Sequence, residues 1–266
     1  SILENTYSSS DIITLQEVSS DFIDKASKSI LGEIYHVIAP DDLDAVRDQN
    51  SVILLNRKTF SDIQALREIT AAVTNAFPEG LKVPVANGDI LAVSVTDKHG
   101  SKYVIASFHG DTNGLATIPV LNAIVKAISS DSSLKDHSLI FGLDANTYDN
   151  FKPGKTQDVM EFGEKFVAHE LTSCWGDIPD AKNYTTYNAR TYLQPQLNKA
   201  CKSDDKRKMG DINPKDFILF PKAKFEVEQT WKDNTGKMEY IEDMAFPTLD
   251  FPSDHGILAT VLKPKN

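Results

Sequence analysis

The sequence is poor in cysteine, in long apolar runs and in positive charge. Two cysteines among 266 residues, Cys174 and Cys201, are too few for a disulfide framework or a four-thiolate zinc site. They could form one bridge, although free structural thiols are favoured. No apolar run reaches the ~20 residues that a membrane helix needs. A net charge of −10 disfavours non-specific binding to a polyanion. The negative charge does not exclude a nuclease, because metal ions bound by carboxylates can bring positive charge to a phosphate.

An initiator methionine is also missing, since the chain begins Ser1-Ile2-Leu3. Such a start is typical of a trimmed or processed end. It is compatible with a targeting peptide that has been removed, so the compartment is not predicted. The oligomeric state is likewise left undetermined. The content of 41% hydrophobic and 25% charged residues is ordinary for a globular protein, and the length suits one large domain or two smaller ones.

Short β-type segments outnumber helical ones along the chain. We predict strands at 11–18, 51–56, 90–95, 102–108, 138–143, 216–220 and 223–231, helices at 21–32, 62–77, 116–128 and 156–171, and a closing segment at 251–261. Lys98-His99-Gly100 predicts a hairpin turn. Because the helices fall between pairs of strands, the pattern favours a four-layer α/β/β/α sandwich of two mainly antiparallel sheets. Residues 172–213 form a long irregular connection, which is typical of a functional or disordered segment.

The segment from Ser138 to Asn146 is an apolar run that ends in a carboxylate and a carboxamide. In an extended chain residues two apart point to the same face, so Asp144 and Asn146 are expected to project together past the end of a strand. Taken alone, these two residues are better explained by a simple turn.

Further polar residues stand at the ends of other predicted strands. Each could belong to a turn by itself, but one site assembled from several strands is the better explanation for all of them. They are Glu17, His109, Asp216, Asp254 and His255.

Carboxylates, an amide and two histidines favour hydrolysis of a phosphate ester with a hard divalent cation. Mg²⁺ prefers oxygen ligands, so the histidines are expected to act on phosphoryl oxygens or to transfer protons. A zinc site is the alternative, and His169, Glu170 and Cys174 offer a weak version of it.

Five short motifs resemble, in order, those of the endonuclease/exonuclease/phosphatase superfamily, which includes pancreatic-type deoxyribonucleases. The motifs are Leu15-Gln16-Glu17, Ser107-Phe108-His109, Gly142-Leu143-Asp144-Ala145-Asn146, Asp216-Phe217-Ile218 and Ser253-Asp254-His255. The resemblance runs from residue 11 to residue 262. It implies a single domain over residues 1–266 with the α/β/β/α sandwich fold.

The resemblance also implies roles for the motif residues. Glu17 and Asp254 match the acidic residues of the metal site, which is expected to take Mg²⁺ or Mn²⁺. Asp144 matches the residue that positions or deprotonates the attacking water, and Asn146 matches its partner. His255 matches the histidine that contacts the scissile phosphate.

Two further motif residues complete the implied site. Asp216 matches the carboxylate that pairs with the phosphate-contacting histidine, and a carboxylate there favours the protonated imidazole. His109 falls where many members have a histidine near the phosphate or the leaving group.

The sequence departs from the family pattern in three places. The strand that opens the family fold, upstream of Leu-Gln-Glu, is expected to be missing from residues 1–266. The spacing between Gly142 and Asp144 is one residue longer than in the family's Gly-Asp-x-Asn. Asp216-Phe217-Ile218 resembles deadenylase-like members more than inositol phosphatases.

The expected function is divalent-metal-dependent hydrolysis of a phosphodiester in single-stranded nucleic acid or a nucleotide. Arg190 and Tyr187 are the candidate substrate-binding residues, because guanidinium groups bind phosphate and tyrosines stack on bases. One alternative is a phosphatase or phospholipase-C-like hydrolase of lipid headgroups or small phosphomonoesters. The other is a catalytically inactive binding module on the same scaffold.

Overall fold

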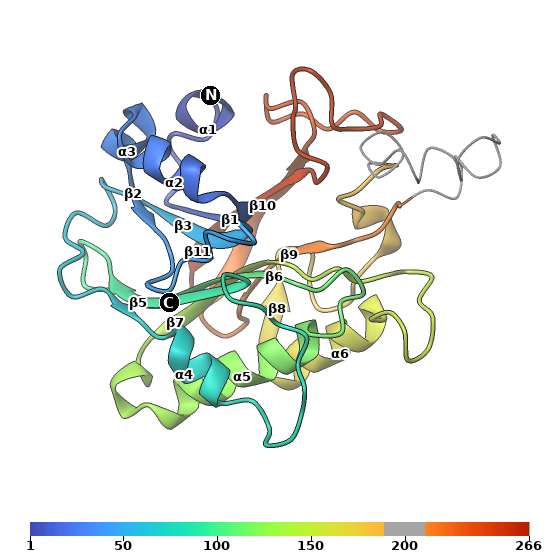
Figure 1. The fold of residues 1–266 in the computed structure, drawn as a ribbon, viewed down its shortest axis with the longest axis horizontal. Helices are drawn as coiled ribbons and strands as arrows, with labels where there is room; N and C mark the ends of the chain where they lie inside the picture. Colours follow the sequence, from blue (N-terminus) through green and yellow to red (C-terminus); the bar gives the residue numbers. More distant parts are fainter. Residues whose placement is uncertain (189–210, 266) are drawn as a thin grey trace.

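The computed structural model describes residues 1–188 and 211–265, in which two β layers pack between helices (Figure 1). The helices are α1 (Ile2–Asn5), α2 (Ser20–Ser27), α3 (Ile30–Ile34), α4 (Thr70–Asn75), α5 (Thr117–Ser130) and α6 (Val159–Ala168), with 3₁₀ helices at Ser132–Leu134 and Ala181–Asn183. The strands are β1 (Ile12–Val18), β2 (Tyr35–Ile38), β3 (Asn50–Asn56), β4 (Arg67–Glu68), β5 (Ile90–Thr96), β6 (Lys102–His109), β7 (Ser138–Asp144), β8 (Leu171–Ser173), β9 (Asp216–Pro221), β10 (Phe225–Asp233) and β11 (Ile257–Pro264).

One β layer is a six-stranded sheet with the order β4-β5-β6-β7-β9-β8. Its pairs are antiparallel except β6 with β7, which run parallel. Parallel neighbours need a crossover connection, and α5 lies in the connection between these two strands. The ends of β6 and β7 therefore lie at the same edge of the sheet.

The other β layer consists of a three-stranded sheet, β1-β3-β2, and a two-stranded sheet, β10-β11. Among the residues that the structure describes, β1 pairs only with β3, and β11 pairs only with β10. Most residues of β1 and β11 remain partly exposed, whereas every residue of β3 is buried. The expectation that the opening strand of the family fold is missing from residues 1–266 stays a prediction.

Three hydrophobic clusters separate the layers. The first lies between the six-stranded sheet and α4, α5 and α6, and it includes Phe141 and Phe162. The second fills the space between the two β layers, and the third lies between β3 and α2 and α3. Ile53 of β3 belongs to the second cluster and Leu54 to the third, as expected for a strand that is buried on both faces. The predicted four-layer α/β sandwich is confirmed.

The predicted helix over 62–77 is wrong in its first half. Only Thr70–Asn75 is helical, and Arg67–Glu68 forms an edge strand against β5. Ile63 and Leu66 pack into the cluster between the sheets, whereas Val73 packs into the cluster under the outer helices. One helix could not serve both clusters, because they lie on opposite faces of the sheet.

The predicted helix over 21–32 is two helices, α2 and α3. The break falls at Lys28 and Ser29, and the Ser29 hydroxyl accepts from Leu31 N to cap α3. The hairpin between β5 and β6 is confirmed, and Gly100 takes the left-handed conformation that its turn needs, with φ +85°.

Cys174 is a buried free thiol, as expected, and burial raises its pKa to about 12. Cys201 lies outside the described residues. None of the helices in the described parts of the chain is long and apolar enough to cross a membrane.

A buried carboxylate joins the start of the chain to the end of β10. Asp233 accepts the Tyr7 hydroxyl at 2.7 Å and backbone N–H groups of Thr235, Gly236 and Met238 at 2.7, 2.7 and 2.9 Å. Burial disfavours the charged form, but these hydrogen bonds outweigh it and hold the pKa of Asp233 below its usual value. The charge of Asp233 therefore stabilises the fold above the unfolded pKa of about 3.8.

We expect Asp233→Asn to lower the free energy of unfolding by about 2–4 kcal/mol at pH 7, because an amide NH₂ would face backbone donors. Since the stabilisation from a lowered pKa is lost as the pH falls, the difference from wild type should shrink below pH 4. Urea titrations at pH 7 and pH 3.5 measure both values. An equal loss at the two pH values would contradict this account.

Candidate active site

Three polar side chains share one row across the middle of the six-stranded sheet. His109 at the end of β6 lies opposite Asp144 at the end of β7 in the parallel register. Asp144 in turn lies opposite Asp216 at the start of β9 in the antiparallel register. Residues opposite one another on neighbouring strands point to the same face of a sheet, so register alone brings these three together.

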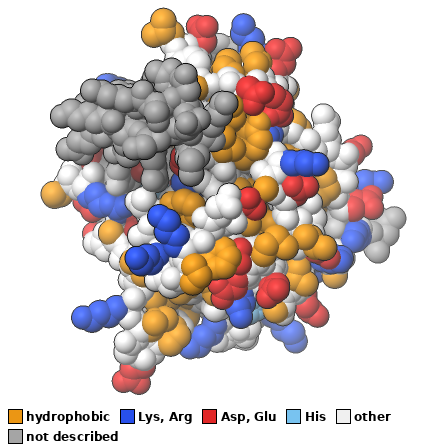
Figure 2. Space-filling model, turned by 90° about the vertical axis from the view of Figure 1, so that its right-hand side faces the viewer, with side chains coloured by type: hydrophobic (Ala, Val, Ile, Leu, Met, Phe, Trp, Pro, Cys, Tyr) orange, Lys and Arg blue, Asp and Glu red, His pale blue; other side chains and the backbone are white. Residues whose placement is uncertain are grey.

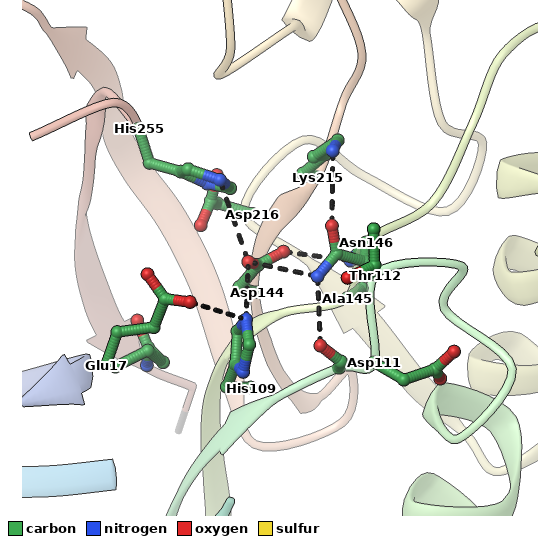
Figure 3. A network of polar contacts seen from close by, with 12 residues as sticks. Glu17, His109, Asp111, Thr112, Asp144, Ala145, Asn146, Lys215, Asp216 and His255 are labelled. Atoms are coloured by element: carbon green, nitrogen blue, oxygen red, sulfur yellow. Dashed lines mark hydrogen bonds and ion pairs between the residues drawn. The ribbon is translucent and has the colours of Figure 1, made fainter. Parts of the chain in front are cut away.

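Asp144 stands between two imidazoles at the centre of the site (Figure 3). Its Oδ2 is 3.6 Å from His109 Nε2 and 3.7 Å from His255 Nε2. His255 Nδ1 lies 2.8 Å from Asp216 Oδ2, within hydrogen-bond distance. Glu17 reaches the same place from the other β layer, with its Oε1 at 3.4 Å from His109 Nε2. Five residues from four strands and one loop therefore converge on one site.

Asn146 contacts Asp144, but not because the chain is extended. The chain turns after β7, and Asn146 adopts the left-handed conformation with φ +48°. This turn lets Asn146 N donate to Asp144 Oδ1 at 2.9 Å and Asn146 Nδ2 donate to Asp144 Oδ2 at 3.3 Å. The predicted neighbours are thus found together, and the geometry is an Asx-type turn rather than a continued strand.

The loop after His109 packs directly under this turn. Gly110 N donates to Asp144 O at 2.7 Å, and Asn146 Nδ2 donates to Gly110 O at 2.9 Å. Gly114 has φ +71°, and a Cβ there would lie 2.5 Å from Asn146 O. Only glycine fits that approach at Gly114, whereas a Cβ at Gly110 would lie 3.1 Å from each of three oxygen atoms, a tight contact.

Glu17 has an unusual backbone for a residue at the end of a strand. Its φ is +56°, and the register of β1 against β3 shifts between Leu15 and Val18. A bulge at the end of a strand re-aims one side chain, and strained conformations of this kind cluster at functional sites. The bulge turns the half-exposed Glu17 carboxylate toward His109.

The surroundings of the site shift the pKa values of Asp144 and His255. Burial raises the pKa of Asp144, and the charge of the adjacent Asp216 raises it further. The two histidines and Lys215 act in the opposite direction but do not outweigh burial. Burial disfavours a charged His255, yet the carboxylates of Asp216 and Asp144 outweigh it and raise the pKa of His255 to about 10. At neutral pH His255 is therefore an imidazolium that faces Asp144.

Two residues of the site escaped the sequence analysis. Thr185 is buried, and its hydroxyl accepts from Lys215 N at 3.2 Å and Asp216 N at 3.1 Å while its carbonyl accepts from Gly256 N at 2.7 Å. Thr185 thus joins the start of β9 to the turn that carries His255. Lys215 is fully buried, with Nζ 3.1 Å from Asn146 Oδ1. A lysine between a proline and an aspartate resembles an exposed turn residue, so no sequence signal marks it.

The described residues contain one group of three side chains close enough to share a metal ion: Asp144, Asp216 and His255, whose ligand atoms lie within 4.8 Å of one another. This group includes neither Glu17 nor Asp254. Asp254 is partly buried next to His255, where its charge helps to raise the histidine pKa. The assignment of Glu17 and Asp254 to a metal site therefore stays a prediction.

Tyr187, a predicted substrate-binding residue, bonds an acidic side chain of the segment between β10 and β11. The Tyr187 hydroxyl donates to Asp243 Oδ1 at 3.0 Å, and the Tyr187 ring lies 5.8 Å from that of Tyr184. Arg190 lies outside the described residues. The alternative zinc ligands gain no support. His169 Nε2 lies within hydrogen-bond distance of Asn122 Oδ1, at 2.7 Å. Within residues 1–188 and 211–265, the one group of side chains that could hold a metal ion does not include Cys174.

Comparison with known proteins gives matches at the level of structure alone. No protein-family model and no curated protein sequence matches the chain. The mannosyl-6-phosphatase Bt3783 of Bacteroides thetaiotaomicron is similar with a TM-score of 0.60 and 16% identity, over 98% of this chain and 88% of that chain. An endonuclease/exonuclease/phosphatase family protein of the same organism gives 0.58 and 14%, over 98% and 84%.

A third similar structure is TDP2 of D. rerio in complex with a single-strand DNA product, with a TM-score of 0.55 and 15% identity, over 94% of this chain and 85% of that chain. At sequence identities this low, the similarity shows the fold alone. It extends over nearly the whole described chain and agrees with the two β layers and flanking helices described above. This chain has the fold of the endonuclease/exonuclease/phosphatase proteins.

Proposed function

We propose that this protein hydrolyses a phosphate ester and that Asp144, His255 and Glu17 carry the chemistry. The observation that supports this most strongly is the placement of Asp144 Oδ2 between two imidazole nitrogens, at 3.6 and 3.7 Å, with His255 bonded to Asp216. A carboxylate beside a fixed imidazolium supplies both a proton acceptor and a cation for the phosphoryl oxygens.

In the proposed reaction, Asp144 accepts a proton from the attacking water. Its raised pKa makes it a better base than an ordinary carboxylate. Asn146 holds the carboxylate in place with two N–H donors. His255 keeps its proton, because its pKa of about 10 lies above neutral pH, and stabilises negative charge that develops on the phosphate.

The donor groups of the site fit a hard divalent cation. Glu17 and Asp144 both direct a carboxylate oxygen toward His109. Because Glu17 is half-exposed, its carboxylate can bind an ion that enters from solvent. Glu17 and Asp254 are the proposed metal-binding residues, since a protonated His255 cannot be a ligand. A bound Mg²⁺ or Mn²⁺ would neutralise charge on the phosphoryl and leaving oxygens. His109, next to Glu17, is suited to hold or transfer a proton near the leaving group.

A phosphodiester of single-stranded nucleic acid or a nucleotide is the proposed substrate class. Tyr187 lies two residues after Thr185, which is hydrogen-bonded to the proposed catalytic strand β9. Its hydroxyl donates to Asp243 Oδ1 at 3.0 Å, so its ring is suited to a base rather than to a phosphate. The fold neighbour TDP2 holds a single-strand DNA product.

The surface charge argues against tight non-specific binding to a long polyanion. On the described part of the face shown in Figure 2, basic and acidic side chains are interspersed among apolar ones rather than gathered in a basic stripe. With a net charge of −10, binding should depend on contacts at the site. Short single strands or nucleotides are therefore favoured over long duplexes.

A substrate panel tests the proposal. Purified protein is incubated with single-stranded RNA, single-stranded DNA, sphingomyelin vesicles and mannose 6-phosphate, with Mg²⁺, with Mn²⁺ or with EDTA. We expect cleavage of a nucleic acid substrate, its loss in EDTA and its return when Mg²⁺ or Mn²⁺ is added in excess.

The other results of the panel discriminate the alternatives. Release of phosphate from mannose 6-phosphate alone would favour a phosphomonoesterase, a candidate supported by the similar mannosyl-6-phosphatase. Hydrolysis of sphingomyelin alone would favour a lipid headgroup substrate. No turnover on any substrate with either cation would favour a binding module. Activity unchanged in EDTA would overturn the metal dependence.

A further inference from the structure

A fully buried lysine stands directly behind the proposed catalytic residues. Lys215 immediately precedes Asp216 and has no exposed side-chain surface. Its backbone is fixed on both sides, since Lys215 O accepts from Ala145 N at 2.7 Å and Lys215 N donates to Thr185. Burial of an ammonium group costs free energy unless the group is well paired, so the residues that pair with Lys215 indicate its role.

Among the described residues, the ammonium has two oxygen partners and one aromatic neighbour. Lys215 Nζ lies 3.1 Å from Asn146 Oδ1 and 2.9 Å from Asp211 Oδ2, and 5.1 Å from the centroid of the Tyr148 ring. The Asp211 contact explains how the charge is tolerated. The Asn146 contact reaches into the site, as Figure 3 shows.

The Asn146 contact decides which way the amide points. An ammonium has only donors, so it must face the amide oxygen. Asn146 Nδ2 then points the other way and donates to Gly110 O at 2.9 Å and to Asp144 Oδ2 at 3.3 Å. A reversed amide would place NH₂ against the ammonium and its oxygen against a carbonyl and a carboxylate. All three contacts would become repulsive.

We propose that Lys215 is a positioning residue that fixes the Asn146 amide so that its NH₂ group is held on the Asp144 carboxylate. This inference rests on the proposed function of Asp144 as the base. Asn146 takes the left-handed conformation in its turn, and its side-chain amide then reaches Lys215 on one side and Asp144 and Gly110 on the other. Lys215 touches no reacting atom in this account.

The kinetic test uses Lys215→Met, which keeps most of the side-chain volume and removes the charge. Turnover of bis(4-nitrophenyl) phosphate with Mg²⁺ is expected to show a kcat lowered by about 10- to 100-fold, as for a lost hydrogen bond to a charged group, with KM within about threefold. In an Asn146→Ala background the same change should lower kcat by less than about threefold, since the residue it acts through is gone. An equal loss in both backgrounds would overturn the proposal.

A matched control separates positioning from the loss of any buried lysine. Lys232 is also nearly buried, and its Nζ lies 3.1 Å from Tyr184 O and over the rings of Tyr184 and Tyr240. Lys232→Met should leave kcat within about threefold of wild type. A comparable fall of kcat in Lys232→Met and Lys215→Met would overturn the proposal. If Lys215→Met does not fold, Lys215→Met combined with Asp211→Asn replaces it, because the pair then loses both charges.

A spectroscopic readout tests the same contact without turnover. In protein labelled with ¹⁵N-asparagine, the side-chain NH₂ signals of Asn146 are assigned by their absence from Asn146→Ala. They should shift and broaden in Lys215→Met and stay in place in Lys232→Met. Unchanged Asn146 signals in Lys215→Met would overturn the proposal. Should wild type hydrolyse no phosphate ester, the proposed function fails, whereas this experiment still decides whether Lys215 orders the amide.

Discussion

Replacing Asp144 by asparagine is expected to lower kcat/KM by about 10³-fold or more while leaving the protein folded, because the amide cannot accept the proton of the attacking water. The same change should keep or raise the melting temperature. Burial raises the pKa of Asp144, which means that the fold disfavours its anion at neutral pH. A neutral side chain of the same shape removes that cost. Initial rates on the best substrate of the panel and thermal unfolding at pH 7 measure the two effects.

Asp233 provides the matched control for this prediction. It is a second buried carboxylate, but backbone donors and Tyr7 hold its pKa below the usual value. Asp233→Asn should therefore lose stability and keep its turnover, whereas Asp144→Asn should lose turnover and keep its stability. Near-full activity in Asp144→Asn would remove the proposed base. A large loss of stability in Asp144→Asn would show that the charge of Asp144 supports the fold.

Replacing His255 by alanine is expected to lower kcat by about 10²- to 10³-fold, the usual effect of removing one group that stabilises developing charge. His255 is held by Asp216 at 2.8 Å, and its charge persists to a pH near 10. His169→Ala is the control, since His169 contacts Asn122 on the outer helices and should keep wild-type turnover. Rates of the three proteins on one substrate give the comparison. Unchanged turnover in His255→Ala would refute the assignment.

The pairing of His255 with Asp216 also predicts a change in the pH dependence of activity. A group whose pKa is raised on folding stabilises the fold below its unfolded pKa and loses that contribution as the pH rises through its folded pKa. For His255 this window runs from 6.5 to about 10. Asp216→Asn removes the first partner and should move the loss of charge toward neutral pH, so that activity at pH 9 falls more than activity at pH 6. An identical pH profile in Asp216→Asn and wild type would contradict the role of this pair.

Much of the fold could be predicted because local pattern and tertiary packing agree. The apolar run Ser138–Asp144 is buried on both faces and lies in the middle of the six-stranded sheet. The prediction failed at 62–77, where apolar residues at helical spacing divide between two cores. Spacing along the chain cannot say which layer each residue will enter. The short strands β2, β4 and β8 were missed because they take their form from their neighbours in the sheets.

The site divides in a similar way. Glu17, His109, Asp144, Asp216 and His255 were predicted, and the sheet registers and the turn before β11 bring them together. The roles of Thr185 and Lys215 were not predicted. Neither residue type marks a site by itself, and both act through contacts between segments that are distant in sequence. Asp254 and Tyr187 keep their predicted roles as proposals.

The amino-acid sequence by itself determined which chemical groups are present and that they stand where strands end. Only the tertiary structure decided that two imidazoles flank one carboxylate, that Glu17 turns inward at a bulge and that a buried ammonium faces the Asn146 amide oxygen. The physical reason is that periodicity reports a local preference for burial. Register, dielectric environment and the partner of each buried charge arise only when distant segments pack against one another.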